Sequence, residues 1–192
     1  MGRPGLKRAA VVEAAGDIVD REGFGNLTMA GLAKWLGVAL PSLYTHVRSL
    51  EHLRRELALV VTEELSRRMG EAIQGRAGRD AVFALAGAYR DYVLRCPGRY
   101  AMAMAARPAP SEDDARYRDA ALKCAGVVYS AVRGYGVAEP ALTDAARFLR
   151  AALHGFVSIE TQGGFTLSQN LSPAFDALMA GVDRALASWP RP

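Results

Sequence analysis

The sequence predicts an all-α protein of about nine helices, in which a small helix-turn-helix domain precedes a larger helical domain. Apolar residues recur with the spacing of amphipathic helices along most of the chain, and no segment alternates as a strand would. Hydrophobic residues make up 51% of the 192 residues, which is enough for a folded core. Because short predicted helices come first and longer ones follow, we place the two domains at residues 1–50 and 51–192.

The first predicted helix occupies residues 9–22. Starting at Val11, its apolar residues recur at i, i+3, i+4, i+7 and i+8, and Gly23 follows as a C-terminal glycine. Residues 24–28 are expected to form a loop. Thr28 can then cap a second helix, because its hydroxyl can accept hydrogen bonds from the free amides of the first turn.

The second helix is short, because Gly37 follows soon after its start. A third helix is expected to open at Leu40-Pro41, where the missing amide of proline costs no intrahelical hydrogen bond. Leu43 and Val47 are four positions apart in this helix and are expected to face inward.

Arg48 and Ser49 are expected to close the third helix, and Ser49 can cap a fourth helix that reaches about Ile73. A linker at residues 74–80 follows, and Ser111 with Asp114 forms a capping-box pattern further along the chain. The remaining helices are expected at residues 80–95, 99–106, from this cap to about 134, 140–162 and 172–188.

The charge of the chain permits an anionic partner without establishing one. The net charge is +4 and the isoelectric point is about 9.3. Cys96 and Cys124 lie in no metal-ligand or CxxC pattern, so we expect free thiols in a reducing compartment. The N-terminus lacks the apolar region of a secretory signal, and charges interrupt every run long enough to span a membrane. We therefore expect a soluble, cytoplasmic protein with no membrane partner.

An enzyme is not expected. His46 and His52 are six positions apart, which does not put them on one helical face as metal ligands. The sequence has no HExxH or GxSxG motif and no phosphate-binding glycine loop. We predict no catalytic residues, no metal and no cofactor.

Three short helices with a tight turn between the second and the third are typical of a helix-turn-helix, in which the last helix enters the major groove of DNA. The outward residues of the third helix and its flanks are the candidate DNA contacts. Apolar and small side chains there can contact thymine methyls or hydrogen-bond base edges, while longer polar ones can reach phosphates. The candidates are Arg3, Thr28, Leu40, Pro41, Ser42, Tyr44, Thr45, His46 and Arg48.

Two of these candidates lie outside the third helix. Thr28 caps a helix whose N-terminus could face a phosphate. Arg3 belongs to a basic N-terminal arm that also holds Lys7 and Arg8, and such arms often enter the adjacent minor groove. From spacing alone, an ordinary surface helix remains an equal alternative for the third helix.

The segment from about Leu6 to Leu57 resembles the DNA-binding domain of the tetracycline-repressor (TetR) family of transcriptional regulators. The similar stretch reads EGFGNLTMAGLAKWLGVALPSLYTHVRSLEHL. In that family a Leu-Thr before the second helix, a Leu-Gly-Val turn and a Leu-Tyr-x-His-Phe/Val recognition helix recur, and residues 27–28, 36–38 and 43–47 match them. The chain departs from the family where a lysine usually starts the fourth helix, because Leu50 stands there. That lysine commonly contacts the DNA backbone, so either one anchor is missing or Arg48 or Arg54 replaces it.

The resemblance also implies a homodimer that binds a palindromic double-stranded DNA operator. Its C-terminal domain would dimerise through residues 140–162 and 172–188 and hold an unknown small-molecule effector. The stretch LRAALHGFVSIETQGGF is similar to a C-terminal subclass with a His-Gly pair in this helix. We predict a ligand-responsive repressor. An activator, a ligand-independent regulator or a helical protein-binding adaptor are the alternatives.

Large adaptable residues of the central helices are candidates for the effector pocket. For any one of them, ordinary core is the more common role of such a residue, and a histidine beside a glycine in an apolar stripe more often lies in the core or at a helix interface. The candidates are Tyr89, Tyr92, Tyr100, Met102, Met104, Phe148 and His154.

Overall fold

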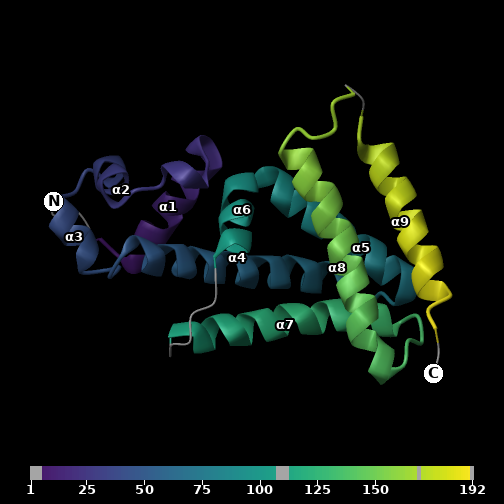
Figure 1. Cartoon of the computed structure of the whole chain (residues 1–192). Helices are drawn as coiled ribbons and strands as arrows, with labels where there is room; N and C mark the ends of the chain where they lie inside the picture. The colour runs from purple at the N-terminus through teal and green to yellow at the C-terminus, as the bar shows by residue number, and fades with distance from the viewer. Residues whose placement is uncertain (1–5, 107–112, 168–169, 191–192) are drawn as a thin grey trace. The chain divides into compact units, whose positions relative to one another are not determined.

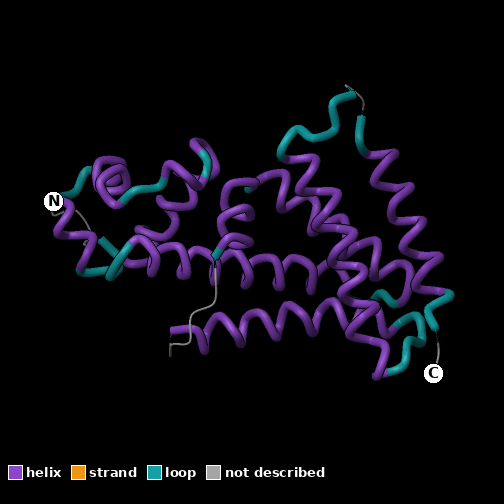
Figure 2. The backbone as a smooth tube through the Cα atoms, viewed as in Figure 1, coloured by secondary structure: helices purple, strands orange, loops and turns teal. Residues whose placement is uncertain are grey.

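The computed structural model describes residues 6–106, 113–167 and 170–190. Within these ranges the chain forms nine α-helices and one 3-10 helix and no β-strand, which confirms the predicted all-α fold (Figures 1 and 2). Arg3 and Ser111, named above as a DNA contact and a helix cap, lie outside the described residues. Among the residues that are described, no helix is long and apolar enough to cross a membrane.

The chain divides into two compact units, each made of separate stretches of sequence. The first unit contains the chain up to Glu63 together with Cys96–Ala120, and the second contains Glu64–Arg95 and the chain from Ala121 onward. The assignment of a DNA-binding domain to residues 1–50 and of a ligand-binding domain to residues 51–192 stays a prediction. The compact units describe packing and do not define functional domains.

The first unit contains the N-terminal helices together with all or part of three later ones. They are α1 (Arg8–Glu22), a 3-10 helix (Phe24–Asn26), α2 (Met29–Leu36), α3 (Leu40–Tyr44), the start of α4 (Leu50–Ile73), α6 (Pro97–Ala105) and the start of α7 (Asp113–Arg133). The amphipathic face of α1 forms the centre of this unit, with Val11 and Ala15 fully buried. The structure has a 3-10 helix where a loop was expected before α2.

Helix α3 is shorter than predicted. It ends at Tyr44 instead of reaching Arg48, because the amides of His46 and Val47 both turn back to the carbonyl oxygen of Leu43, each at 2.9 Å. The Thr45 hydroxyl adds a further bond to the carbonyl oxygen of Ser42, at 2.7 Å. These bonds close the helix after little more than one turn.

Helix α6 packs very closely on α1 within the first unit. A Cβ atom added at Gly98 would lie 1.9 Å from the carbonyl oxygen of Val19, so only glycine permits this approach. Beside it, the Arg99 guanidinium contacts three carboxylates of α1, from Glu13, Asp17 and Asp20, at 2.9, 2.7 and 2.8 Å. The Arg99 amide also donates to Asp20 Oδ1 at 2.9 Å. Both the steric fit and the charge fix α6 to α1.

The second unit contains the longer helices. They are the end of α4, α5 (Gly78–Arg95), the end of α7, α8 (Glu139–Thr161) and α9 (Ser172–Ala187). Leu85, Leu149 and Met179 are almost fully buried, and α5, α8 and α9 pack against one another in this unit. Helix α5 begins at Gly78, slightly before the predicted start, and α6 at Pro97, so the loops there are shorter than expected. Neither Cys96 nor Cys124 forms a disulfide bond.

Candidate nucleic-acid interface and ligand pocket

Helices α2 and α3 form the predicted helix-turn-helix. Thr28 caps α2 by accepting a hydrogen bond from the Gly31 amide at 3.0 Å. Gly37 ends α2 in the left-handed conformation, with φ of 65°, which favours glycine. The Val38 amide returns to the carbonyl oxygen of Ala33 at 3.0 Å, and α3 begins soon afterwards at Leu40. Local hydrogen bonding therefore sets both ends of α2, and with its C-terminal end the start of the turn.

Helix α3 separates its apolar anchors from its polar face. Leu43 and Val47 have no exposed surface, while Tyr44 is 49% exposed and Leu40 is 37% exposed. The exposed residues also include Thr28, Pro41, Ser42, Thr45 and Arg48, and His46 is half-buried. The side chains predicted to face inward are buried, and those predicted to face outward are exposed except for His46. DNA contact by the outward side chains stays a prediction.

Cationic side chains surround this face. Lys34 and Arg48 are exposed, and Arg21 lies over the ring of Trp35 at 5.1 Å from the centroid. Arg8 is the first residue of α1, and its guanidinium lies 2.6 Å from Glu56, so it belongs to the folded unit and not to a free arm. Phosphates could be reached from this rim through Lys34 and Arg48.

The first turn of α4 has the predicted cap and an unexpected buried histidine. The Ser49 hydroxyl accepts a hydrogen bond from the His52 amide at 3.1 Å. Leu50, which replaces the family lysine, is half-buried, whereas Arg48 is exposed. His52 is 4% exposed and contacts both Arg8 and the Arg48 backbone. From the sequence, His52 was considered only as a metal ligand and rejected. Its structural role was missed because Arg8 is brought next to it only by the fold.

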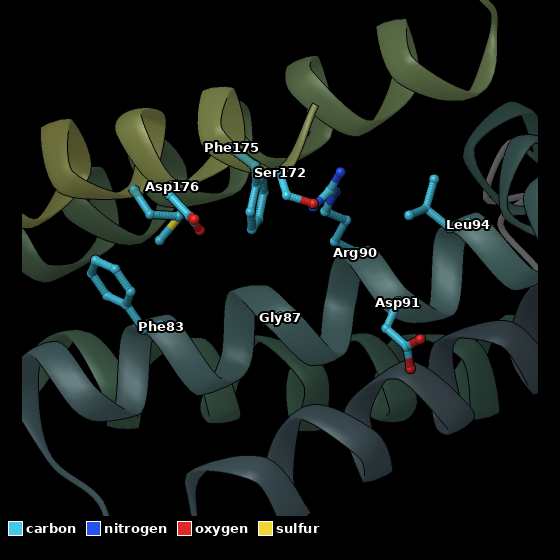
Figure 3. A pocket seen from close by; sticks show the side chains of 9 residues that line it. Phe83, Gly87, Arg90, Asp91, Leu94, Ser172, Phe175 and Asp176 are labelled. Atoms are coloured by element: carbon cyan, nitrogen blue, oxygen red, sulfur yellow. The ribbon is translucent and has the colours of Figure 1, made fainter. Parts of the chain in front are cut away.

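A cavity of about 400 Å³ lies between α5 and α9 in the second unit (Figure 3). Arg90 extends from α5 toward Ser172 at the start of α9, and Phe175 points back toward α5. The Arg90 guanidinium lies 4.7 Å from the centroid of the Phe175 ring and is bound by Glu160 at 2.9 and 2.5 Å. This hydrogen-bonded ion pair raises the pKa of Arg90 above its usual value. The cavity is lined by Phe83, Gly87, Arg90, Asp91, Leu94, Ser172, Phe175, Asp176 and Met179.

None of the predicted pocket residues lines this cavity. Tyr89, Tyr92, Tyr100 and Met102 are buried, Met104 and Phe148 are partly exposed, and His154 is half-buried with its Nδ1 at 3.3 Å from the Ser158 hydroxyl. Tyr100, Met102 and Met104 belong to the first unit and the other candidates to the second. Phe175 and Met179 have the apolar spacing of core residues along α9, so the sequence does not mark them as cavity lining. Arg90 gave no signal because its partner Glu160 is 70 positions away in the sequence.

Comparison with known proteins identifies the family. The family described as tetracyclin repressor-like, C-terminal domain, matches residues 82–182. The uncharacterised HTH-type transcriptional regulator Rv0681 of Mycobacterium tuberculosis is 40% identical over 158 residues, which cover 82% of this chain and 72% of the relative. The chain belongs to the TetR family of transcriptional regulators. Its helix-turn-helix is therefore the family's DNA-binding element, as the resemblance implied.

Solved structures of other proteins share the fold of this TetR family member. BioQ, solved with its double-stranded DNA operator, superposes with a TM-score of 0.69 and 23% identity over 95% of this chain and 99% of BioQ. A variant of TetR from Acinetobacter baumannii AYE, solved in complex with minocycline, superposes with a TM-score of 0.67 and 21% identity over 96% of each chain.

Proposed function

We propose that this TetR family member is a ligand-responsive repressor that binds a palindromic operator as a homodimer. The observation that carries the proposal is the exposed face of α3, held by two anchors, Leu43 and Val47, that have no exposed surface. An exposed helix of this kind can enter the major groove, with its polar side chains toward base edges. The fold shared with operator-bound BioQ supports this role.

We infer that the two predicted domains have different functions. Residues 1–50 would bind DNA, and residues 51–192 would bind the effector and dimerise, in a cytoplasmic protein without enzymatic activity. Helix α8 exposes Ile159 and Phe148, at 45% and 37%, and a second copy of the chain could cover them. In a symmetric dimer two copies of α3 would enter successive major grooves, roughly 34–36 Å apart.

The cavity between α5 and α9 is the candidate effector site. Its volume of about 400 Å³ suits a small organic molecule, and it combines aromatic walls with the polar groups of Arg90, Ser172 and Asp176. A ligand would release DNA only if it bound the DNA-incompetent conformation more tightly than the competent one. The minocycline complex of a protein with the same fold supports a small-molecule effector.

Selection of bound sequences from a random duplex pool tests the proposal. The purified protein is incubated with the pool at two salt concentrations, and we expect an inverted repeat to be enriched at both. Weak binding that enriches no sequence and disappears at the higher salt would reflect phosphate attraction alone. That result would contradict the proposal and favour a protein-binding adaptor.

We expect Thr45→Ala to change base preference at one position of each half-site, by ~1–3 kcal/mol. Its hydroxyl proton is engaged by the Ser42 carbonyl, so the exposed methyl group and the remaining lone pairs of Oγ1 are available to a base. Repeating the selection with the variant measures the change. An unchanged set of enriched sequences would remove Thr45 from base recognition.

Tyr44→Ala and His46→Ala are expected to weaken binding to all sequences alike, by about 1 kcal/mol each. Both side chains lie at the end of α3, where the chain leaves the proposed groove, and Tyr44 is 49% exposed. Fluorescence anisotropy with the operator and a scrambled duplex measures the effect, and Tyr44→Phe is the matched control for the hydroxyl. Loss of the dimer in either variant, seen by sedimentation, would instead assign a structural role.

A further inference from the structure

Apart from the tyrosines, His52 is the one polar or charged residue among those described that is almost completely buried. Its two ring nitrogens both face N–H donors. Nδ1 lies 3.2 Å from the backbone nitrogen of Arg48, and Nε2 lies 2.9 Å from Nη2 of Arg8. The imidazole therefore lies between the N-terminus of α1 and the turn that follows α3.

Ionisable groups surround the ring from several helices. Arg8 comes from α1, and Glu56 lies one turn further along α4, with its Oε1 2.6 Å from Arg8 Nη2 and 3.8 Å from His52 Nε2. Arg116 of α7 lies 4.0 Å from the same oxygen. Glu56 favours a positive charge on the ring, while Arg8 opposes it at shorter distance.

The proton state of the ring decides whether it can hold the turn. A neutral imidazole has one lone pair, so it can accept a hydrogen bond at only one of its two nitrogens, and an imidazolium can accept at neither. In the tautomer that carries its proton on Nε2, Nδ1 accepts from the Arg48 amide, and Nε2–H lies on the side of Glu56 Oε1, 3.8 Å away. Protonation would thus leave the Arg48 amide facing another donor at a buried position, next to the added charge and Arg8. An unsatisfied buried donor is costly, so the turn would loosen.

The turn matters because α3 cannot position itself. Helix α3 contains five residues, which is too short for independent stability, and Thr45–Ser49 connects it to α4. Val47 anchors this connection in the core, and the Arg48 amide is the next backbone group that the structure ties down. A displacement of Arg48 would therefore be transmitted to α3.

We propose that His52 is a positioning residue for DNA recognition, whose unprotonated imidazole holds the Arg48 turn and with it the recognition helix. The proposal rests on the proposed function of the chain as a DNA-binding regulator. His52 itself would not contact DNA. Its effect would appear in operator affinity and in the dependence of that affinity on pH.

Two substitutions separate the hydrogen bond from the buried volume. In His52→Asn, the side-chain oxygen can occupy the place of Nδ1 and accept from Arg48, but it does not titrate. In His52→Leu, the volume remains apolar and no acceptor is present. We expect His52→Leu to bind the selected operator roughly tenfold more weakly than wild type, with His52→Asn within about threefold of wild type.

The pH profile supplies a readout that a purely structural role would not give. From about pH 8 to about pH 5, where histidine titrates, operator affinity of the wild type should fall relative to that of His52→Asn. Circular dichroism of the free proteins is the control for folding. Equal operator affinity of wild type and His52→Leu, or identical pH profiles of wild type and His52→Asn, would overturn the proposal.

Hydrogen exchange of the Arg48 amide, followed by NMR in the free protein, separates this inference from the proposed function. The amide should be protected in wild type and in His52→Asn and exchange freely in His52→Leu. Equal exchange in all three proteins would overturn the inference even if the operator is bound. If the wild type enriches no operator, the proposed function fails, and the exchange rates alone decide whether His52 holds the turn.

Discussion

Gly98→Ala is expected to destabilise the protein by about 3 kcal/mol or more. The added Cβ would lie 1.9 Å from the carbonyl oxygen of Val19 and 2.7 Å from the amide nitrogen of Asp20. Both atoms belong to the backbone of α1, which cannot rotate away as a side chain could. Relief requires α6 to move off α1, and Arg99 would then lose its contacts with the carboxylates of α1.

Urea unfolding of the purified variants measures this effect. Gly87→Ala is the matched control, because Gly87 also lies inside a helix, is exposed, and its added Cβ meets no atom within 4 Å. Removing glycine from a helix stabilises it by up to about 1 kcal/mol, so the two variants should change stability in opposite directions. A Gly98→Ala protein as stable as wild type would mean that α6 does not pack on α1 as described.

Leu43→Ala is expected to lose about 2–5 kcal/mol of stability and to abolish specific DNA binding. Leu43 has no exposed surface and is the one buried residue of α3, so its truncation leaves a cavity beneath the recognition helix. A helix of this length depends on such packing and not on its own hydrogen bonds. DNA binding would therefore be lost because α3 is no longer held in the position needed to enter the groove.

Leu40→Ala provides the comparison on the same helix, because Leu40 is 37% exposed. It should leave unfolding nearly unchanged and alter DNA binding only. Thermal unfolding and operator titration of both variants distinguish the anchor from the contact surface. Equal stability of the two variants would contradict the assignment of Leu43 as the anchor.

The parts of the fold that depend on neighbouring residues were predictable from the sequence. Thr28 and Gly37 set the ends of α2 through hydrogen bonds within a few positions, and the two-sided character of α3 follows from the spacing of Leu43 and Val47. The early end of α3 was missed because the same apolar spacing would also fit a longer helix.

Contacts between distant residues were not predictable in this way. Arg99 meets Asp20 across 79 positions, and Arg8 meets His52 across 44. Nothing local in the sequence marks such pairs. The cavity between α5 and α9 was missed for a related reason, since an apolar side chain that lines a cavity has the same spacing as one that fills the core.

The discontinuity of the first unit limits how the protein can be recombined. The helix-turn-helix and α6 are separated by Glu64–Arg95, yet Gly98 and Arg99 fit specifically against α1. A chimera that joins residues 1–50 to the remainder of another regulator would carry α1 without the helix shaped to receive it. The carboxylates of Glu13, Asp17 and Asp20 would then face the side chain that the other regulator has in place of Arg99. Exchange of operator specificity between such proteins therefore requires matched substitutions on both sides of this junction.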